Sequence, residues 1–524
     1  MQRRNFLKSS LALAAATKLG TGKAQALVSA HNWSNYDFGS GPAVTDRLNQ
    51  GPFPQYPPDA VIPTDEVVMT TTASEEVVPN YGKGLITYIT ADSGTEEIKA
   101  DNIPQAIEDL VKFPLGQQVY IRPTWREVQP KPGKLALPDY VKQIFDLAKK
   151  NNKRVGLRIQ MNAPDYKHAH ALPDFVLDKV PMVELIPDEK ERKAAARFSE
   201  NPYSRSQPRF DHPFFQQAFA DLVGELAAEF NGNPLVEYFD TFLYGFWGEG
   251  HTWPFVNTPF PDSLTAERTL VKMMEVQLEH FTKTPLMTNT QPDYSKVGNA
   301  AVLDLSIRTN NWIRSDTIFI ENEQIEALSN RPPWVAAALE QGMPIKTPDP
   351  SASVEGVSPT ENMIAHVIDV GASYWSLWNF HAISAKNLQA YYDAYPKAFD
   401  LINRRIGYRV RPSFIWSYED SGYLGLIIGF ANDGITGVPG VLRVTVESAD
   451  GKVLKSGCLD AGYPLPGKLR QAQFILPQGT KFEGLKLKAE IEVKGMRYPV
   501  QWACRQKLND NGSLTLRPNL HHGF

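Results

Sequence analysis

A single acidic side chain stands in an unusual setting between positions 244 and 253. Glu249 lies between two glycines in the segment Tyr-Gly-Phe-Trp-Gly-Glu-Gly-His-Thr-Trp, and Trp247 and Trp253 bracket it. Aromatic rings offer flat faces to sugar rings, and an apolar setting raises the pKa of a carboxyl group, as a general acid requires. The competing interpretation is a structural carboxylate that accepts backbone N–H bonds from the glycine turn. The segment favours a general acid beside a sugar-binding surface.

A second carboxylate, Glu340, ends the apolar run Trp-Val-Ala-Ala-Ala-Leu at 334–339. A buried strand that ends in a single Glu places that carboxylate at the carboxyl end of the strand. Glycoside hydrolysis uses two carboxylates on opposite walls of one site, one to protonate the leaving oxygen and one to attack or to activate water. Glu321 and Glu323 compete with Glu340 for the second role, but they fall in the loop after an earlier predicted strand.

The elements that must position these carboxylates alternate along the chain. Eight apolar segments predict buried parallel strands beginning at residues 85, 118, 155, 236, 285, 302, 334 and 373. Amphipathic segments such as 139–150, 214–230, 264–281 and 360–370 predict helices between them. Eight such units favour a (β/α)₈ TIM barrel, whose active site lies at the carboxyl ends of its strands. A doubly wound open sheet is the alternative, but no glycine-rich turn follows the first strand.

The sequence pattern changes after a predicted last helix over 385–405, from alternating strands and helices to short strands separated by turns. Short alternating strands at 412–416, 423–430, 441–447, 471–475 and 485–493 are separated by Asn-Asp-Gly, Ala-Asp-Gly and Pro-Gly turns. This pattern predicts a C-terminal β-sandwich domain over 409–524, following a catalytic barrel over 79–408. Cys458 and Cys504 both lie in the sandwich, and the sequence is equally compatible with one disulfide bridge and with two free thiols.

The first residues are typical of an export signal. Arg3 and Arg4, the Phe-Leu-Lys that follows and an Ala-Gln-Ala site ending at residue 26 predict a twin-arginine signal peptide over 1–26. The Pro-, Gly-, Ser- and Asn-rich segment 27–78 is predicted to be an extended lead-in. We therefore expect a periplasmic or secreted protein that does not remain in a membrane after signal cleavage.

Composition limits the remaining function classes. The chain of 524 residues has a net charge of -4, which becomes -9 when the five basic residues of 1–26 are removed. Without a basic excess, nucleic acid is not an expected partner. Two cysteines cannot form a four-cysteine zinc site. His168-Ala169-His170 has the His-x-His spacing of metal-binding amidohydrolase barrels, but in those barrels the pair follows the first strand, whereas here it follows the third predicted strand. No metal or other cofactor is expected, and no Gly-x-Ser-x-Gly elbow is present.

Two further segments carry a resemblance to a known family. The segments Arg-Pro-Thr-Trp-Arg-Glu-Val-Gln-Pro-Lys-Pro-Gly at 122–133 and Arg-Val-Gly-Leu-Arg-Ile at 154–159 resemble the second and third units of clan A glycoside hydrolases. That clan includes retaining β-galactosidases and cellulases, and the resemblance covers roughly residues 80–405. It implies an acid/base Glu after strand four, a nucleophile Glu after strand seven and an aromatic residue after strand eight. Glu249, Glu340 and either Trp375 or Trp378 occupy those places.

One position departs from the clan. The clan usually has Asn before the acid/base, where its amide meets a sugar hydroxyl, and this chain has Gly248. Asn162, Asn289 or Gln291 are the candidates for the missing amide. Arg122 and Arg158 either join barrel strands through buried ion pairs or keep the nucleophile ionised. The complete set of predicted substrate-binding residues is Arg122, Trp125, Arg158, Asn162, Trp247, His251, Trp253, Asn289, Trp375 and Trp378.

These inferences predict an exported glycoside hydrolase that cleaves a β-linked glycoside by a two-glutamate retaining mechanism, β-galactosidase-like or related. Its expected partner is an oligosaccharide, polysaccharide or other glycoside substrate. The alternative function is a catalytically silent carbohydrate-binding barrel that uses the tryptophans without the acid pair. No pattern in the sequence specifies the sugar, the linkage, exo or endo action, or the oligomeric state.

Overall fold

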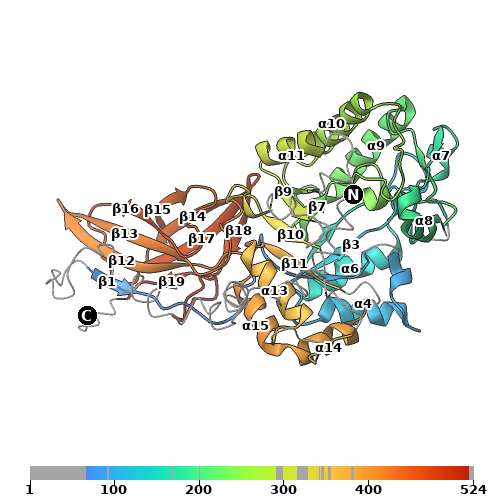
Figure 1. The fold of residues 1–524 in the computed structure, drawn as a ribbon. Helices are drawn as coiled ribbons and strands as arrows, with labels where there is room; N and C mark the ends of the chain where they lie inside the picture. The colour runs from blue at the N-terminus through green and yellow to red at the C-terminus, as the bar shows by residue number, and fades with distance from the viewer. Residues whose placement is uncertain are drawn as a thin grey trace, which may run out of the picture.

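The computed structural model describes residues 67–90, 94–166, 169–199, 201–290, 299–315, 328–340, 343, 347–351, 356–378 and 383–517. The predicted signal peptide, most of the predicted lead-in, and Gln291, Glu321 and Glu323 lie outside these residues. A barrel surrounded by helices and a layered β domain lie side by side (Figure 1).

Eight parallel strands form a closed barrel, which confirms the predicted fold class. In barrel order they are β2 (Gly84–Tyr88), β3 (Gln118–Ile121), β4 (Arg154–Leu157), β7 (Val236–Asp240), β8 (Leu286–Asn289), β9 (Trp312–Ser315), β10 (Ala337–Leu339) and β11 (Tyr374–Leu377). The last strand returns to the first, with Tyr374 opposite Gly84. Because these strands are covered on both faces, most of them are nearly continuous apolar runs in the sequence.

The prediction of the sixth strand was wrong. Residues 302–307 belong to helix α11 (Asn299–Arg308), and the strand is β9, a few residues later. A short apolar run does not distinguish a strand from the buried face of a helix, and Val302 provides such a face in α11. β9 was hidden because Arg314, a charged residue, occupies a buried position in it.

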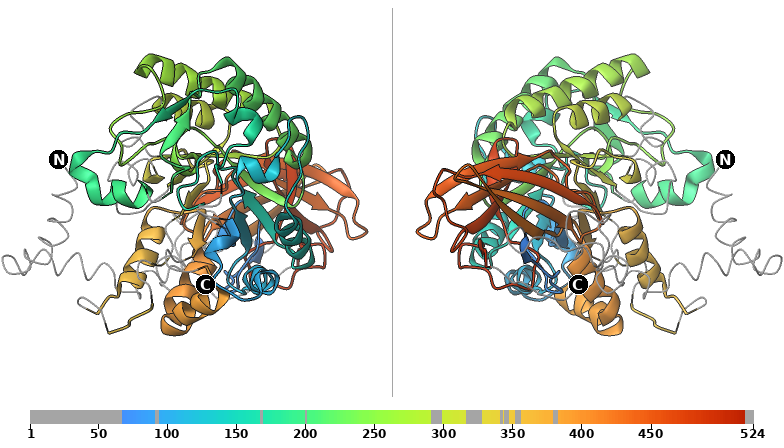
Figure 2. Two further views of the ribbon diagram at one scale, coloured as in Figure 1. Left: turned by 90° about the vertical axis from the view of Figure 1, so that its right-hand side faces the viewer. Right: turned by 90° about the vertical axis from the view of Figure 1, so that its left-hand side faces the viewer.

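Helices cover the outside of the barrel (Figures 1 and 2). The main ones are α4 (Ile103–Lys112), α6 (Asp139–Lys150), α9 (Pro213–Phe230), α10 (Ser263–His280), α11, α13 (Pro359–Asp369), α14 (Ala385–Ala394) and α15 (Pro396–Arg405). The single helix predicted over 385–405 is divided at Pro396, which lacks the N–H that a continuous helix needs. Within the described part of the chain, no helix has the length and apolar character required to cross a membrane.

The C-terminal region contains two antiparallel sheets, consistent with the predicted β-sandwich. One sheet has the order β1 (Val67–Thr70), β12 (Val410–Asp420), β13 (Tyr423–Asn432) and β16 (Leu469–Ile475). The other has the order β15 (Val453–Leu459), β14 (Val441–Glu447), β17 (Lys486–Val493) and β18 (Met496–Val500), with β19 (Leu514–Thr515) also on β17. β1 comes from the predicted lead-in, a pairing that its irregular composition did not indicate.

Both cysteines of the sandwich are free thiols, so of the two possibilities that the sequence left open the structure has the unbridged one. Cys458 is exposed on β15, whereas Cys504 is buried. Burial raises the pKa of the Cys504 thiol to about 11. This thiol therefore stays protonated, and unreactive as a nucleophile, at neutral pH.

The amino end of the barrel is closed by a polar cluster that also contacts the sandwich. Glu237, at the start of β7, is fully buried and accepts a hydrogen bond of 2.7 Å from the Tyr374 hydroxyl. Arg154 lies 3.5 Å from the same carboxylate. The Arg154 guanidinium also lies over the rings of Tyr81 and Tyr498, 5.2 and 5.4 Å from their centroids. Because Tyr498 belongs to β18, the cluster joins the barrel to the β domain.

Glu237 gives a pH-dependent prediction. Burial raises the pKa of Glu237, although Arg154 and hydrogen bonds oppose the shift. Between the unfolded pKa of about 4.3 and the higher folded value, the native protein binds a proton that the unfolded chain lacks. The free energy of unfolding should therefore fall as pH rises through that window, and Glu237→Gln should remove this dependence.

Urea unfolding of wild type and Glu237→Gln at several pH values between 4 and 8 measures the difference. The exposed carboxylate of Asp304 is suitable for a control, Asp304→Asn, which should leave the pH dependence as it is in wild type. Parallel curves for wild type and Glu237→Gln would contradict the assigned direction.

Candidate active site

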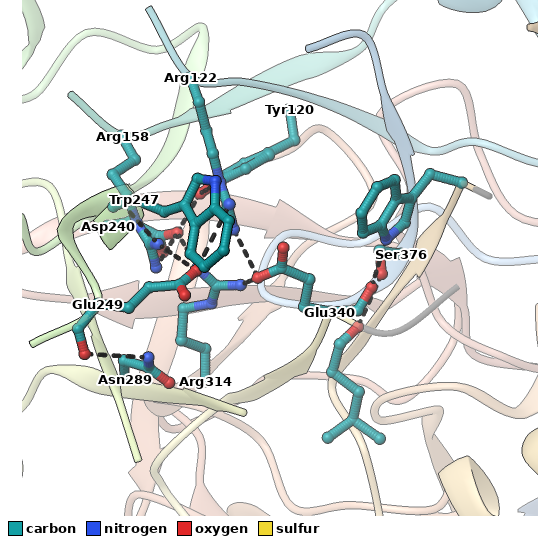
Figure 3. Close-up of polar contacts among 12 residues, drawn as sticks. Tyr120, Arg122, Arg158, Asp240, Trp247, Glu249, Asn289, Arg314, Glu340 and Ser376 are labelled. Atoms are coloured by element: carbon teal, nitrogen blue, oxygen red, sulfur yellow. Dashed lines mark hydrogen bonds and ion pairs between the residues drawn. The ribbon is translucent and has the colours of Figure 1, made fainter. Parts of the chain in front are cut away.

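Six charged side chains of the described residues meet at the carboxyl ends of the barrel strands (Figure 3). Three are carboxylates and three are guanidinium groups, and every one is almost fully buried, with no more than 4% of its residue surface exposed. They are Asp240, Glu249, Glu340, Arg122, Arg158 and Arg314. Buried charges are stable only when they are paired, and these three positive and three negative side chains form one network of ion pairs.

Glu340 directly follows β10, as predicted, and the neighbouring strands fix its backbone. Its N–H donates to the Ser315 carbonyl at the end of β9 (3.0 Å). Its carbonyl accepts a hydrogen bond of 2.8 Å from the Trp378 indole beyond β11. The carboxylate turns to the barrel axis, where it contacts Arg122 at 2.5 Å and also pairs with Arg314.

Glu249 is presented by a tight turn beyond β7. Gly245, Gly248 and Gly250 have φ angles of 87°, 79° and 82°, in the left-handed region that favours glycine. A Cβ on Gly245 would lie 2.1 Å from the His251 carbonyl oxygen. At position 248, where the clan A resemblance leads one to expect Asn, the backbone itself favours glycine.

The carboxylate of Glu249 is surrounded by cationic and imidazole side chains. Arg158 lies 3.0 Å away, Arg122 lies 3.5 Å away, and the His251 Nε2 lies 3.4 Å from the other oxygen. The competing interpretation of Glu249 required backbone N–H donors from the glycine turn. The contacts described for this carboxylate are instead with side chains that converge on it from three segments of the chain.

Asp240 connects the two halves of the network, and the sequence analysis missed it. One of its oxygens lies 3.2 Å from Arg158 and 3.1 Å from Arg314, and it also accepts a hydrogen bond from the Tyr120 hydroxyl. Asp240 ends β7, but Glu237 lies in the same strand, so Asp240 does not stand out as the single acidic residue that ends an apolar run, as Glu340 does. Arg314 was missed because its strand was predicted in the wrong place.

Arg122 determines the spacing of the two glutamates, because opposite nitrogens of its guanidinium contact Glu249 and Glu340. With contacts of 3.5 and 2.5 Å, the two facing oxygens are at most roughly 8 Å apart across this rigid fork. Carboxyl separations of about 5–5.5 Å are typical of retaining glycosidases, and about 6.5–9.5 Å of inverting ones. The two glutamates therefore share one site, at a separation compatible with two-carboxylate chemistry.

The structure distinguishes the two tryptophans proposed after the eighth strand. Trp378 lies next to Glu340, and its ring stacks on Tyr88 with centroids 5.5 Å apart. Trp375 is fully buried and stacks on Phe399 of α15, on the outer side of the strand. Of these two residues, Trp378 therefore holds the position at the site.

The other predicted tryptophans fall into two groups. Trp125 is fully buried against Phe215, and its indole donates to Gln129, so it packs in the core and presents no surface to a ligand. Trp247 and Trp253 are half-buried and pack around Phe198 of α8 (Arg192–Ser199) above the barrel. Figure 3 shows Trp247 on the same segment as Glu249, and its indole N–H has no hydrogen-bond partner among the described residues.

The two described candidates for the missing amide contact the turn that carries Glu249, Asn289 at Glu249 itself and Asn162 at the Trp247 N–H. The Asn289 amide donates to the backbone carbonyl of Glu249 (3.4 Å), and the Asn162 amide donates to the Ser204 carbonyl (3.4 Å). Both side chains are buried, and within the described part of the chain neither side-chain oxygen has a hydrogen-bond partner. Each offers an acceptor of the kind that a sugar hydroxyl requires.

The histidine pair considered for a metal is only partly described, since His168 lies outside the described residues. His170 uses its Nδ1 to accept a hydrogen bond from the Leu172 N–H (3.1 Å). Burial, assisted by Arg126, lowers the pKa of His170 to about 4. The described residues contain no group of three or more His, Cys, Asp or Glu side chains arranged to hold a metal ion.

Comparisons with known proteins find distant structural similarity alone. No protein-family model and no curated protein matches the sequence. Among solved structures, an endoglycoceramidase II from Rhodococcus sp. is 12% identical, over 78% of this chain and 99% of that one, with a TM-score of 0.37. A cold-adapted β-galactosidase from Rahnella sp. R3 is 11% identical, over 64% and 57%, with a TM-score of 0.38. A psychrophilic family 10 endo-β-1,4-xylanase is 12% identical, over 57% and 86%, with a TM-score of 0.32.

Arg122 gives the second prediction. Arg122→Met retains most of the apolar stem but removes the guanidinium that Glu249 and Glu340 share. Two buried carboxylates then lose a cation, and we expect unfolding at pH 7 to become easier by about 3–5 kcal/mol. Urea denaturation measures this change. Arg308→Met is the control, because its ion pair with Asp304 is exposed and should contribute less than about 1 kcal/mol. Equal losses in both variants would contradict the shared role of Arg122.

Proposed function

We propose that the protein is an exported retaining glycoside hydrolase that cleaves a β-linked glycoside. The observation that carries the proposal is the arrangement of Glu249 and Glu340, which follow the fourth and seventh barrel strands and contact one guanidinium. Export rests on the sequence pattern of residues 1–26.

In this mechanism Glu340 is the nucleophile. Arg122 and Arg314 favour its ionised form, so it is ready to attack the anomeric carbon. The bond between that carbon and the leaving oxygen breaks as Glu249 gives its proton to the oxygen. The product is an ester between the sugar and Glu340. Water, losing a proton to Glu249, then attacks the same carbon, which releases the sugar and restores both glutamates.

The surrounding side chains provide contacts for a sugar. Trp378, whose indole donates to the Glu340 carbonyl, and the half-buried Trp247 and Trp253 supply aromatic side chains around the site. The side-chain oxygens of Asn162 and Asn289 are acceptors for hydroxyl groups, in the role that an Asn at position 248 would have filled. A glycoside with free hydroxyls is therefore the class of substrate that we expect.

One observation favours the second candidate, a catalytically silent carbohydrate-binding barrel. Glu249 must be protonated to act as an acid, yet Arg122 and Arg158 both lie within ion-pair distance of it and favour its ionised form. A barrel in which the six charges only stabilise the fold would bind sugars without cleaving them. The two candidates therefore differ in turnover rather than in binding.

A panel of alkyl β-glycosides and β-linked disaccharides, whose leaving oxygens need protonation, tests the proposal. We expect wild type to hydrolyse at least one of them, and Glu249→Gln and Glu340→Gln to reduce kcat/KM by more than about a thousandfold, since each removes a group needed in the transition state. Glu237→Gln is the matched control, because it makes the same change in a buried glutamate at the opposite end of the barrel, and it should retain activity.

The stereochemistry of the first product, followed by NMR, separates retention from inversion. A retained anomer supports the glycosyl ester on Glu340. Sugar binding by wild type and by both site variants, without turnover of any glycoside, would instead support the silent binding barrel.

A further inference from the structure

We infer that Asp240 is a positioning residue that sets the charge balance between Glu249 and Glu340, and thereby the pH range in which one is protonated while the other is ionised. The inference rests on the proposed function and extends it to a third carboxylate. Asp240 touches neither glutamate in a described contact; it acts through Arg158 and Arg314.

The geometry places Asp240 symmetrically between the two glutamates. Arg158 joins it to Glu249, with contacts of 3.2 and 3.0 Å from two nitrogens of one guanidinium. Arg314 joins it to Glu340, with 3.1 Å on the side of Asp240. Each of these arginines is therefore shared between Asp240 and a glutamate. The third, Arg122, contacts both glutamates.

The other titratable groups around Asp240 are tyrosines. Tyr120 on β3, Tyr88 on β2 and Tyr238 on β7 itself surround the carboxylate, and burial raises the pKa of each above its ordinary value. These phenols remain neutral at neutral pH and supply no negative charge. Arg158 and Arg314 pair with Asp240, Arg122 donates to the same Tyr120 hydroxyl that donates to Asp240, and Arg122 and His251 also contact Glu249.

The charge count explains why the third carboxylate matters. When Glu249 is protonated for catalysis, three guanidinium groups face two carboxylates, Asp240 and Glu340. Without Asp240, the same state would leave three guanidinium groups facing one carboxylate. The excess positive charge would oppose protonation of Glu249, since nearby cations favour the ionised form of a carboxyl group.

The pH profile of kcat/KM tests this role. In the proposed mechanism its acidic limb reports ionisation of Glu340, and its basic limb reports loss of the proton from Glu249. In Asp240→Asn we expect both limbs to move to lower pH, by about one unit. A purely structural role would lower activity without moving either limb. Glu237→Gln changes a buried carboxylate at the other end of β7 and should leave both limbs where wild type has them.

A charge-compensated variant covers the possibility that Asp240→Asn folds poorly. Combining Asp240→Asn with Arg314→Met removes one cation together with the anion, which restores equal numbers of positive and negative charges. We expect its limbs to return toward the wild-type positions, although its kcat is lower because Glu340 has lost a contact. Limbs that remain at the positions of the single variant would overturn the inference.

An infrared titration separates this inference from the proposed function. The carboxylic acid C=O band that disappears in Glu249→Gln reports protonation of Glu249 without any substrate. Its midpoint should move to lower pH in Asp240→Asn, by about the same one unit. If no glycoside is hydrolysed and the midpoint still moves, the proposed function fails and the charge balance stands. If glycosides are hydrolysed but neither the midpoint nor the limbs move, the inference about Asp240 fails.

Discussion

The guanidinium of Arg122 between Glu249 and Glu340 is the contact on which the arrangement of the site depends. Two buried carboxylates cannot both stay ionised close together unless a cation lies between them, because desolvation and mutual repulsion both oppose their ionised forms. Arg122 lies 2.5 Å from one and 3.5 Å from the other, and thus fixes the distance across the barrel mouth. Arg158 and Arg314 then require Asp240, which makes the network neutral. The rest of the barrel has to hold these six charged side chains within ion-pair distance of one another.

A closed parallel barrel meets this requirement because all its strands end on the same side. The six residues come from positions at or just beyond β3, β4, β7, β9 and β10, so contacts distant in sequence are short in space. β7 carries a buried carboxylate paired with arginine at each of its ends. Glu237 pairs with Arg154 in the cluster that contacts the β domain, and Asp240 pairs with arginines at the site. One short strand thereby connects the sandwich contact to the candidate chemistry.

The sequence predicted the barrel and the two glutamates because both depend on local patterns, namely apolar runs and the residue that ends each run. Glu340 follows its strand directly, and the glycines around Glu249 are needed by a turn with positive φ. Asp240 and Arg314 were not found, because a charge inside a strand weakens the apolar signal and only the folded barrel shows its partners. Trp125 illustrates the opposite error, since it was predicted to bind substrate and lies in the segment that resembles clan A, whereas packing against Phe215 of α9 buries it.

The charge network also defines what separates an active barrel from a silent one. Stability alone is a weak explanation for six buried charges, because apolar side chains of similar volume are often as stabilising as a buried ion pair. The free-energy cost of burying these charges has an explanation if the ionisation states of Glu249 and Glu340 serve catalysis. Among the described contacts, Glu340 has two arginines and Glu249 has two arginines and a histidine, and a glycine-rich turn presents Glu249 whereas Glu340 directly follows β10. Different protonation of two such similar glutamates therefore requires the whole neutral network rather than either ion pair alone.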